Sequence, residues 1–475
     1  MKKRWFLLPA VALLSLFGGA APVQAGTSFG FSAPKYVDLQ LGGGEPGVIA
    51  TGQGTLVYAA HEGTTHLFRS GLAGSPQGDA DFVTNYRNQV NLWTSTDNGV
   101  NWMRVNWNDT GFFTNPAMNT GFSDPDLTLD RSGRLYSTGI DLANDSLFSS
   151  SDGGRSWDRG TPQCHDGDRP WLAGAGPNQV YLATDTVEGP GDGHEVFLST
   201  DGGSSCSANG IPDATSSYEG DGKLYFDPHN GNLVEPAVFF DSNGNVNGVG
   251  ISVLKRGATA FTPIRAANTT LFAHWPAIAI DAADNLYLTW DTDDRVAGTS
   301  GGCGGAPSPA ANSVKLAVSS NYGATWRSFT VAHPGTRVLW PWVTAGAAGK
   351  AAVAWYQTDK LVDVDCQPSA ISVFAAFVQG ANTSRASETR VDASGRPVHI
   401  GSVCQGGTAC VVTGKDRRLG DYFEINLDTR GCLLIAVSDT RLMDPATGGP
   451  LPTARPLFIR QDAGPSLTNQ GPCQP

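Results

Sequence analysis

One eight-residue pattern recurs four times along the chain and narrows the folds that the sequence can adopt. The copies lie at 95–102 (STDNGVNW), 150–157 (SSDGGRSW), 319–326 (SSNYGATW) and, without the final Trp, 199–206 (STDGGSSC). Each follows an alternating apolar segment, which predicts a strand, a tight turn and a second strand. The Asp side chain can close such a turn on backbone N–H groups, and Gly supplies the positive φ that the turn requires.

A second repeat reads as strand, polar turn, strand, and it occurs seven times. The copies lie at 45–61, 123–140, 168–184, 221–240, 274–290, 339–356 and 420–439. Their starts are roughly 45 to 80 residues apart, so each unit leaves room for two more strands, which is typical of a β-propeller. The sequence therefore predicts an all-β propeller with seven blades. The alternating segment 36–42 (KYVDLQL) is expected to close the ring by joining the last blade.

The eight-residue pattern resembles the Asp-box (S-x-D-x-G-x-[ST]-W) of sialidases and other propeller glycosidases, which are also known for BNR repeats. This resemblance implies a propeller fold and a glycan-active hydrolase. It also implies that the boxes are scaffold, because in that superfamily they lie on outer hairpins that face away from the active site. Sialidases have six blades, so a six-bladed propeller is the alternative to the seven counted from the repeats.

The N-terminus has the features of a secretory signal peptide. A basic stretch at 2–4 precedes an apolar run at 5–17, and small residues lead to Ala25. We therefore expect a signal peptide at 1–25, a single propeller domain at 26–475, and a secreted protein, either extracellular or periplasmic. No later stretch is apolar enough to predict a membrane span.

The net charge limits the partners that the protein can bind, and the cysteine content predicts how the chain is cross-linked. The net charge of −12 argues against a nucleic-acid partner, and a monomer that acts on a glycan is expected. Eight Cys in an exported chain predict disulfides and give no CxxC zinc motif. The simplest pairing is Cys404 with Cys410, and Cys303 with Cys366 would link neighbouring loops.

Side chains at the starts of the first strands should converge, because in a propeller these strands line the central channel. Alignment of the seven units places carboxylate, guanidinium and aromatic groups there. Arg suits carboxylates and aromatic faces suit sugar rings. The aligned positions are Asp124, Arg169, Asp221, Trp275, Trp340 and Tyr422, with Asp126, His165, Asp168, Tyr218, Glu219, His274, Arg337, Arg417, Arg418 and Asp421 beside them.

The resemblance to sialidases suggests roles for these groups. Sialidases bind the substrate carboxylate with three Arg, use a Tyr activated by a Glu as nucleophile, and use an Asp as acid/base. By this resemblance Asp124 is the acid, Tyr218 the nucleophile and Glu219 its base. Tyr218 and Glu219 are neighbours, however, and would point opposite ways in a strand. The predicted substrate-binding residues are Arg169, Arg337, Arg417, His165, His274, Asp168 and Trp275.

Three functions remain open from the sequence. The first is a hydrolase that removes a terminal acidic sugar. The second is a lyase of a uronic-acid polymer, in which His or Tyr would remove the C5 proton while Arg neutralises the carboxylate. The third is a propeller that binds glycan or protein without catalysis. No cofactor or catalytic metal is expected. The aspartate cluster has two further interpretations, a solvated channel mouth or a structural Ca²⁺ site, and Asp168 with Arg169 could simply bridge neighbouring blades.

Overall fold

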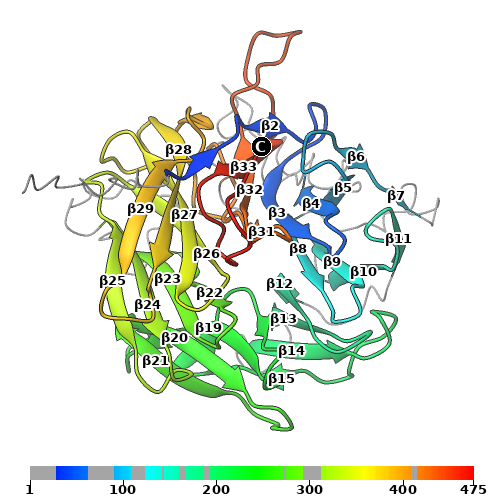
Figure 1. Ribbon diagram of the computed structural model, residues 1–475, viewed down its shortest axis with the longest axis vertical. Coiled ribbons are helices and arrows are strands. Elements are labelled where there is room, and N and C mark those ends of the chain that lie inside the picture. Colours follow the sequence, from blue (N-terminus) through cyan, green and yellow to red (C-terminus); the bar gives the residue numbers. More distant parts are fainter. Residues whose placement is uncertain are drawn as a thin grey trace, which may run out of the picture.

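The computed structural model shows seven β-sheets arranged around a central channel, which confirms the predicted seven-bladed propeller (Figure 1). The structure describes residues 28–61, 90–107, 123–141, 144–159, 167–186, 193–270, 274–292, 312–407, 410 and 415–475. Within these ranges every regular element is a strand, and no helix long and apolar enough to cross a bilayer occurs there. The predicted signal peptide at 1–25 lies outside the described residues.

Blades 1 to 4 follow each other along the chain, and in blades 1 to 3 the first strand lies closest to the channel (Figure 1). Blade 1 contains β3 (Gly44–Ala50), β4 (Leu56–His61), β5 (Val90–Ser95) and β6 (Met103–Arg104). Blade 2 contains β8 (Ser123–Leu129), β9 (Leu135–Asp141), β10 (Asn144–Ser150) and β11 (Ser156–Arg159), with β7 (Asn106–Trp107) parallel to β11. Blade 3 contains β12 (Gly167–Gly174), β13 (Val180–Thr186), β14 (Gly193–Ser199) and β15 (Ile211–Pro212). Blade 4 contains β16 (Ala214–Thr215), β17 (Tyr218–Gly220), β18 (Tyr225–Phe226), β19 (Leu233–Phe240), β20 (Val246–Leu254) and β21 (Thr262–Asn268).

Blades 5 to 7 complete the ring. Blade 5 contains β22 (Ala277–Ile280), β23 (Leu286–Thr292), β24 (Ser313–Ser319) and β25 (Arg327–Ala332). Blade 6 contains β26 (Val338–Ala345), β27 (Lys350–Thr358), β28 (Ser369–Gln379), β29 (Ser387–Asp392) and β30 (His399–Gly401). Blade 7 contains β31 (Ile425–Leu427), β32 (Leu433–Asp439) and β33 (Arg455–Ala463) from the C-terminal part of the chain.

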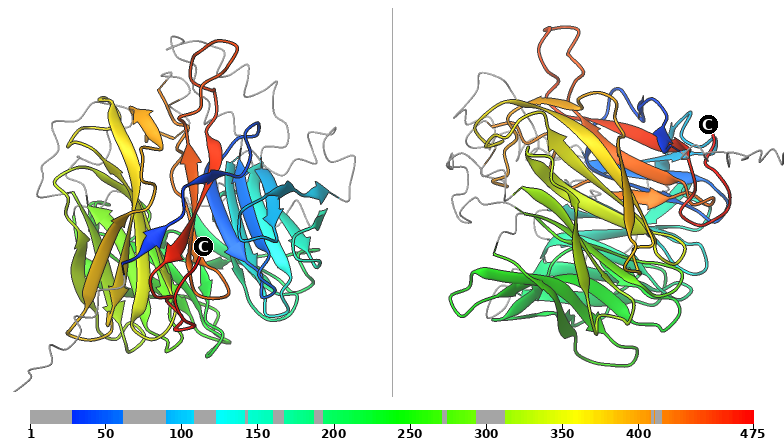
Figure 2. Two further views of the ribbon diagram at one scale, coloured as in Figure 1. Left: turned by 45° about the horizontal axis from the view of Figure 1, so that its top comes forward. Right: turned by 60° about the vertical axis from the view of Figure 1, so that its left-hand side comes forward.

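The N-terminal segment supplies the missing outer strand of blade 7. Strands β1 (Gly30–Phe31) and β2 (Lys35–Tyr36) both pair antiparallel with β33, and the views of Figures 1 and 2 show this segment alongside it. The expected closure of the ring is confirmed, although the pairing begins ahead of the predicted segment 36–42, at Gly30, and includes only Tyr36 of that segment.

The four eight-residue repeats form the same turn between the third and fourth strands of blades 1, 2, 3 and 5. In the second copy, Ser150 Oγ accepts from Gly154 N at 3.0 Å and donates to Asp152 Oδ1 at 2.8 Å. Asp152 in turn accepts from Ser156 N at 3.0 Å and from Ser156 Oγ at 2.7 Å. Because third strands run in the same direction as first strands, these turns lie at the end of the propeller opposite the starts of the first strands.

The glycine at the fifth position of each repeat packs against the preceding blade. A Cβ added to Gly99 would lie 2.2 Å from the ring of Phe458 in blade 7, and one added to Gly154 would lie 2.9 Å from Val57 in blade 1. Both glycines have positive φ, of 81° and 87°. Gly is therefore required twice over, for the backbone conformation and for the close approach of two blades.

A second set of contacts links the blades through the turns between first and second strands. Asp130 accepts within its own turn from Ser132 N at 2.8 Å and across the seam from Asn178 N of blade 3 at 2.7 Å. Asp281 makes the corresponding bond to Gly349 N of blade 6 at 2.8 Å. Buried carboxylates thus stabilise both a turn and a seam.

Two disulfides lie within the described residues. Cys404–Cys410, which the sequence predicted, closes a short loop, and Cys432–Cys473 joins the start of β32 to the C-terminal segment. Cys206 and Cys366 are also disulfide-bonded. The predicted partner of Cys366, Cys303, lies outside the described residues. Disulfides of this number indicate an oxidising environment.

We predict that Trp102→Ala lowers the free energy of unfolding by about 2 to 3 kcal/mol, because the partly buried indole fills the seam between blades 1 and 7. Its ring lies 5.6 Å from that of Tyr58 and 5.2 Å from that of Phe458, both edge-on. Chemical denaturation measures the change. The control is Leu39→Ala, at a side chain that is 60% exposed, for which less than about 0.5 kcal/mol is expected. Equal effects of the two substitutions would contradict the assignment of Trp102 to the seam between blades 1 and 7.

The two disulfides should differ in their contribution to stability. Cys432 and Cys473 are separated by 41 positions, Cys404 and Cys410 by 6. Because a longer closed loop removes more entropy from the unfolded chain, we expect removal of the first pair to cost about 4 kcal/mol and of the second about 2 kcal/mol. Double alanine variants in a denaturation series provide the comparison, and a larger loss for Cys404–Cys410 would refute it.

Candidate functional site

An unusual backbone conformation recurs where the inner strands begin. Glu45, Asp124, Arg169 and Trp340 each precede a Pro and have φ values of 46°, 55°, 58° and 50°. In all four strands the pairing register shifts at this point, which is the pattern of a β-bulge. Positive φ is uncommon for residues other than Gly and gathers at functional sites. We call this end of the channel, where the inner strands begin, the channel mouth.

Glu45 organises the carboxylates of the mouth, and the alignment of sequence repeats did not single it out. Its Oε2 accepts from Ser123 Oγ at 3.2 Å and from Asp124 N at 3.3 Å, and lies 3.1 Å from His61 Nε2. Its Oε1 accepts from Asp421 N at 3.0 Å. The dipeptide Glu45-Pro46 matches Asp124-Pro125 and Arg169-Pro170 in the other units, and this signal could have identified it.

Asp124 lies against this buried glutamate. Desolvation, the charge of Glu45 and then the charge of Asp168 raise the pKa of Asp124 well above its ordinary value, while a hydrogen bond from Ser123 acts in the opposite direction. The shift favours the protonated carboxyl. An acid held protonated beside other carboxylates can donate a proton to a leaving group.

Arg169 lies among carboxylates and against an aromatic ring. Its side chain is 40% exposed, Nη1 is 3.1 Å from Asp185 Oδ2, and the guanidinium lies 4.8 Å from the centroid of Trp275. Desolvation opposes its charge, but Asp221 and Asp185 raise the pKa of Arg169, so it stays a cation. Desolvation raises the pKa of Asp221 to about 7, and Arg169 partly offsets this effect.

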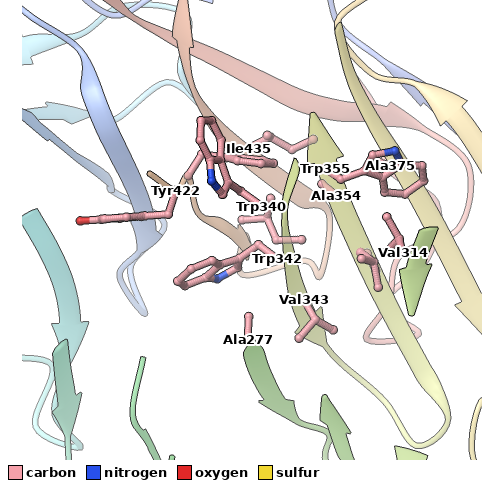
Figure 3. Packing of buried hydrophobic residues seen from close by; sticks show 14 of the residues in the cluster. Ala277, Val314, Trp340, Trp342, Val343, Ala354, Trp355, Ala375, Tyr422 and Ile435 are labelled. Atoms are coloured by element: carbon pink, nitrogen blue, oxygen red, sulfur yellow. The ribbon is translucent and has the colours of Figure 1, made fainter. Parts of the chain in front are cut away.

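An aromatic layer crosses the channel at the mouth. Trp171 is the centre of this layer, with ring centroids 6.2 Å from Trp275, 5.8 Å from Trp342 and 4.9 Å from Tyr422. Figure 3 shows Trp342 and Tyr422 lying against each other in the channel. The Tyr422 hydroxyl donates to Pro125 O at 3.0 Å. We use "aromatic layer" below for these four residues.

The predicted nucleophile and its base occupy a different position. Tyr218 is 5% exposed, and its ring packs on Phe239 in blade 4. Desolvation and the carboxylates of Asp213 and Glu235 raise the pKa of Tyr218. Glu219, the next residue, pairs with Ala214 of β16. The carboxylate nearest the Tyr218 hydroxyl by these interactions is therefore Asp213, which precedes the strand.

Other predicted residues are distributed around the mouth. Arg417 is buried and binds both carboxylate oxygens of Asp421, with Nη1 to Oδ1 at 2.6 Å. His274 has Nδ1 2.5 Å from Asp291 Oδ2 and Nε2 2.5 Å from the Gln405 amide.

The remaining predicted residues are Asp168, Arg337 and His165. Asp168 is exposed next to Arg169. Arg337 has no exposed surface, and its backbone N–H donates to Thr358 Oγ1 at 2.8 Å. His165 lies outside the described residues. The structure thus brings Asp124, Asp168, Arg169 and Trp275 together, with Arg417 beside them, whereas Arg337 and Tyr218 are buried in the blades.

Among the described residues, one group of three side chains has the spacing of metal ligands. Asp227, His229 and Asp284 present ligand atoms within 4.8 Å of one another. They lie on the turns at the end opposite the mouth, so the aspartates of the mouth are not part of this group.

A run of buried ionisable groups extends from the mouth between blades 3 and 4. Asp185 Oδ1 lies 2.8 Å from His194 Nδ1, and His194 Nε2 lies 2.7 Å from Glu235 Oε1. Desolvation opposes the charge of His194, but Glu235 and Asp185 raise its pKa well above the ordinary value. His194 is therefore an imidazolium with both nitrogens occupied, which positions Asp185 against Arg169.

We predict opposite pH dependences for two aspartates. The folded pKa of Asp221 is raised, so its contribution to stability is present below the unfolded pKa near 4 and is lost as pH rises to about 7. Asp221→Asn should therefore stabilise the protein relative to wild type more at pH 8 than at pH 4. Melting temperatures across this range test the sign.

Asp97 of the first eight-residue repeat is the matched control. Desolvation would raise its pKa, but hydrogen bonds from Asn101 and Ser95 lower it. Its contribution is present above the unfolded pKa and is lost as pH falls, so Asp97→Asn should destabilise at pH 8 and lose its effect in acid. If both substitutions changed the melting temperature in the same direction at pH 8, the opposite pKa shifts assigned to Asp221 and Asp97 would be contradicted.

No model of a known protein family matches the chain, and no curated protein matches it in sequence. Among solved structures, a protein of unknown function from Dyadobacter fermentans DSM 18053 has a TM-score of 0.45 and 13% identity, covering 92% of this chain and all of that one. An ulvan lyase has a TM-score of 0.46 and 10% identity, covering 85% and 93%. Trypanosoma rangeli sialidase bound to the inhibitor DANA has a TM-score of 0.41 and 12% identity, covering 72% of this chain and 55% of its own. At these values the likeness is one of fold.

Proposed function

We propose that the protein is a glycoside hydrolase that acts at the channel mouth, with Asp124 as the general acid. The observation that supports this most directly is the placement of Asp124 against the buried carboxylate of Glu45, on a backbone bulge that fixes its position. Protonation of the departing oxygen requires an acid whose pKa is raised, and burial together with the charges of Glu45 and Asp168 raises the pKa of Asp124.

The substrate in this proposal is a terminal acidic sugar bound by Arg169. Among the three arginines that the sequence nominated, Arg169 has a side chain that is 40% exposed, whereas Arg337 and Arg417 are buried. Its free N–H groups can bind a carboxylate, and Trp275 beneath it supplies an aromatic surface for a sugar ring.

The second catalytic role is assigned to Asp168. A hydrolase needs a carboxylate that activates water or attacks the sugar, and Asp168 is exposed next to Arg169. Tyr218 and Glu219 are left out of this proposal because the phenol is buried beside Asp213. Arg337 is left out for the same reason of burial.

A lyase is less well supported by the described residues. Removal of a C5 proton needs a His or Tyr that can accept it. Both nitrogens of His194 and of His274 are already hydrogen-bonded, and the Tyr422 hydroxyl donates to a backbone carbonyl. Hydrolysis at the carboxylates of the mouth requires no such base.

The test is hydrolysis of a panel of fluorogenic sialosides and aryl uronides, with ultraviolet absorbance recorded on uronic-acid polymers in parallel. Asp124→Asn should lower kcat at least about 100-fold, the usual contribution of a general acid, without lowering the melting temperature. Arg169→Ala should raise KM for acidic sugars more than for neutral ones.

Asp152→Asn is the matched control for the activity test, because this aspartate stabilises a turn at the opposite end of the propeller. It should lower the melting temperature and leave kcat unchanged. Absorbance from an unsaturated product would establish a lyase instead. Retention on immobilised glycan without turnover on any substrate would establish a binding protein and refute the proposal.

A further inference from the structure

Two adjoining cavities occupy the half of the channel that lies beyond the aromatic layer, where the inner strands end. Their volumes are about 380 and 220 Å³, and they share Lys223, Leu224, Tyr225 and Asn426 as lining residues. We call this space the lower channel. Most of its remaining wall is apolar and includes Leu127, Leu172, Ile278 and Trp342. Size and lining are those of a small-molecule site.

Lys223 is the charged residue that lines both cavities. Lys223 Nζ donates to Asp126 Oδ1 at 2.6 Å, to Leu127 O at 3.1 Å and to Glu424 Oε2 at 2.8 Å, which uses all three of its donors. The other oxygen of Asp126 accepts from Leu172 N at 2.7 Å. Lys223 and Asp126 are therefore satisfied within the protein.

Glu424 is not satisfied in the same way. The residue is 2% exposed and lines the smaller cavity, and no N–H or O–H group of the described residues donates to its Oε1 atom. In its protonated form the Glu424 carboxyl forms a side-chain hydrogen bond with Asp126. A buried acceptor without a donor costs about 1 to 3 kcal/mol, and more when it carries charge. A ligand that donates a hydrogen bond to this atom would recover that free energy.

The charge of the group favours a cation as donor. Two carboxyl groups face one ammonium group, so the trio carries a net negative charge when both are ionised. Desolvation raises the pKa of Glu424 to about 8, Lys223 lowers it, and Asp126 raises it. At neutral pH a proton therefore balances the group, and a bound ammonium could take the place of that proton.

We propose that the lower channel is a binding site for a small organic amine, whose ammonium group donates to Glu424 Oε1 and whose aromatic or aliphatic body packs on the apolar wall. On binding, the Glu424 carboxylic acid loses its proton to solvent, and the carboxylate forms a charge-assisted hydrogen bond with the ammonium. Trp342 and Tyr225 line the site and can contact the cation or its ring. The aromatic layer separates this site from the mouth, so the inference does not depend on the proposed hydrolase.

The test uses benzylamine as probe and benzyl alcohol as its neutral counterpart, with titration calorimetry between pH 6.5 and 8.5 in buffers of different ionisation heat. A ligand of this size should bind with a Kd on the order of 1 mM. Because Glu424 releases a proton, the affinity for benzylamine should rise with pH by up to about tenfold per unit below pH 8, and that for benzyl alcohol should not.

Three variants separate this site from other binding. Glu424→Gln should weaken benzylamine binding at least about tenfold, because one charge-assisted hydrogen bond is lost. It should also abolish proton release, because glutamine carries no titratable proton. Asp124→Asn at the mouth should leave benzylamine binding unchanged. Ala345→Phe, at a residue that lines the smaller cavity away from the charged group, should block binding by filling the space, and it serves if Glu424→Gln does not fold.

Several results would overturn the proposal. Equal affinities for benzylamine and benzyl alcohol would show that the charge of Glu424 is not used. Binding without proton release, or binding that survives in Ala345→Phe, would place the ligand elsewhere. No heat from benzylamine at any pH, in any of the buffers, would show that the lower channel does not bind the amine.

Discussion

The seams between neighbouring sheets are the interaction on which the rest of the structure depends. Each blade is a twisted sheet with two apolar faces, and it can bury them only against the blades on either side. The glycines of the eight-residue repeats and the carboxylates of Asp130 and Asp281 lie at these seams. The glycines permit close packing, and the carboxylates accept hydrogen bonds from backbone N–H groups. The channel, its mouth and its lower half exist because seven such seams close into a ring.

Much of the fold could be predicted because its signals are local. The eight-residue repeat determines its own turn, and four copies that follow the pattern of seven strand pairs leave few alternatives to a propeller. The position of the mouth also followed from the repeats, since Asp124 and Arg169 occupy the same place in aligned units. Local patterns of this kind can be recognised in the sequence without knowledge of the contacts between blades.

The details of the site could not be predicted from the sequence, because they depend on contacts between residues of different blades. Glu45 lies in the least regular unit, and its importance comes from Asp124 and Asp421, which belong to other blades. Tyr218 and Glu219 were linked by the resemblance to sialidases, yet the carboxylate that acts on the buried phenol is Asp213. The burial of Arg337 is equally invisible in the sequence. The group of Lys223, Asp126 and Glu424 draws on three blades and has no sequence signature.

The pairing of β1 and β2 with β33 has a consequence for biosynthesis. The N-terminal segment contacts residues more than 400 positions away, as in the bond between Ser32 and Arg460, and β33 ends close to the C-terminus. During synthesis the first blade leaves the ribosome with its face toward blade 7 exposed, and blade 7 cannot be completed until β33 has been synthesised. The ring therefore closes only after β33 has been made, and a product of termination before β33 would keep an open sheet edge that quality-control proteases and chaperones recognise.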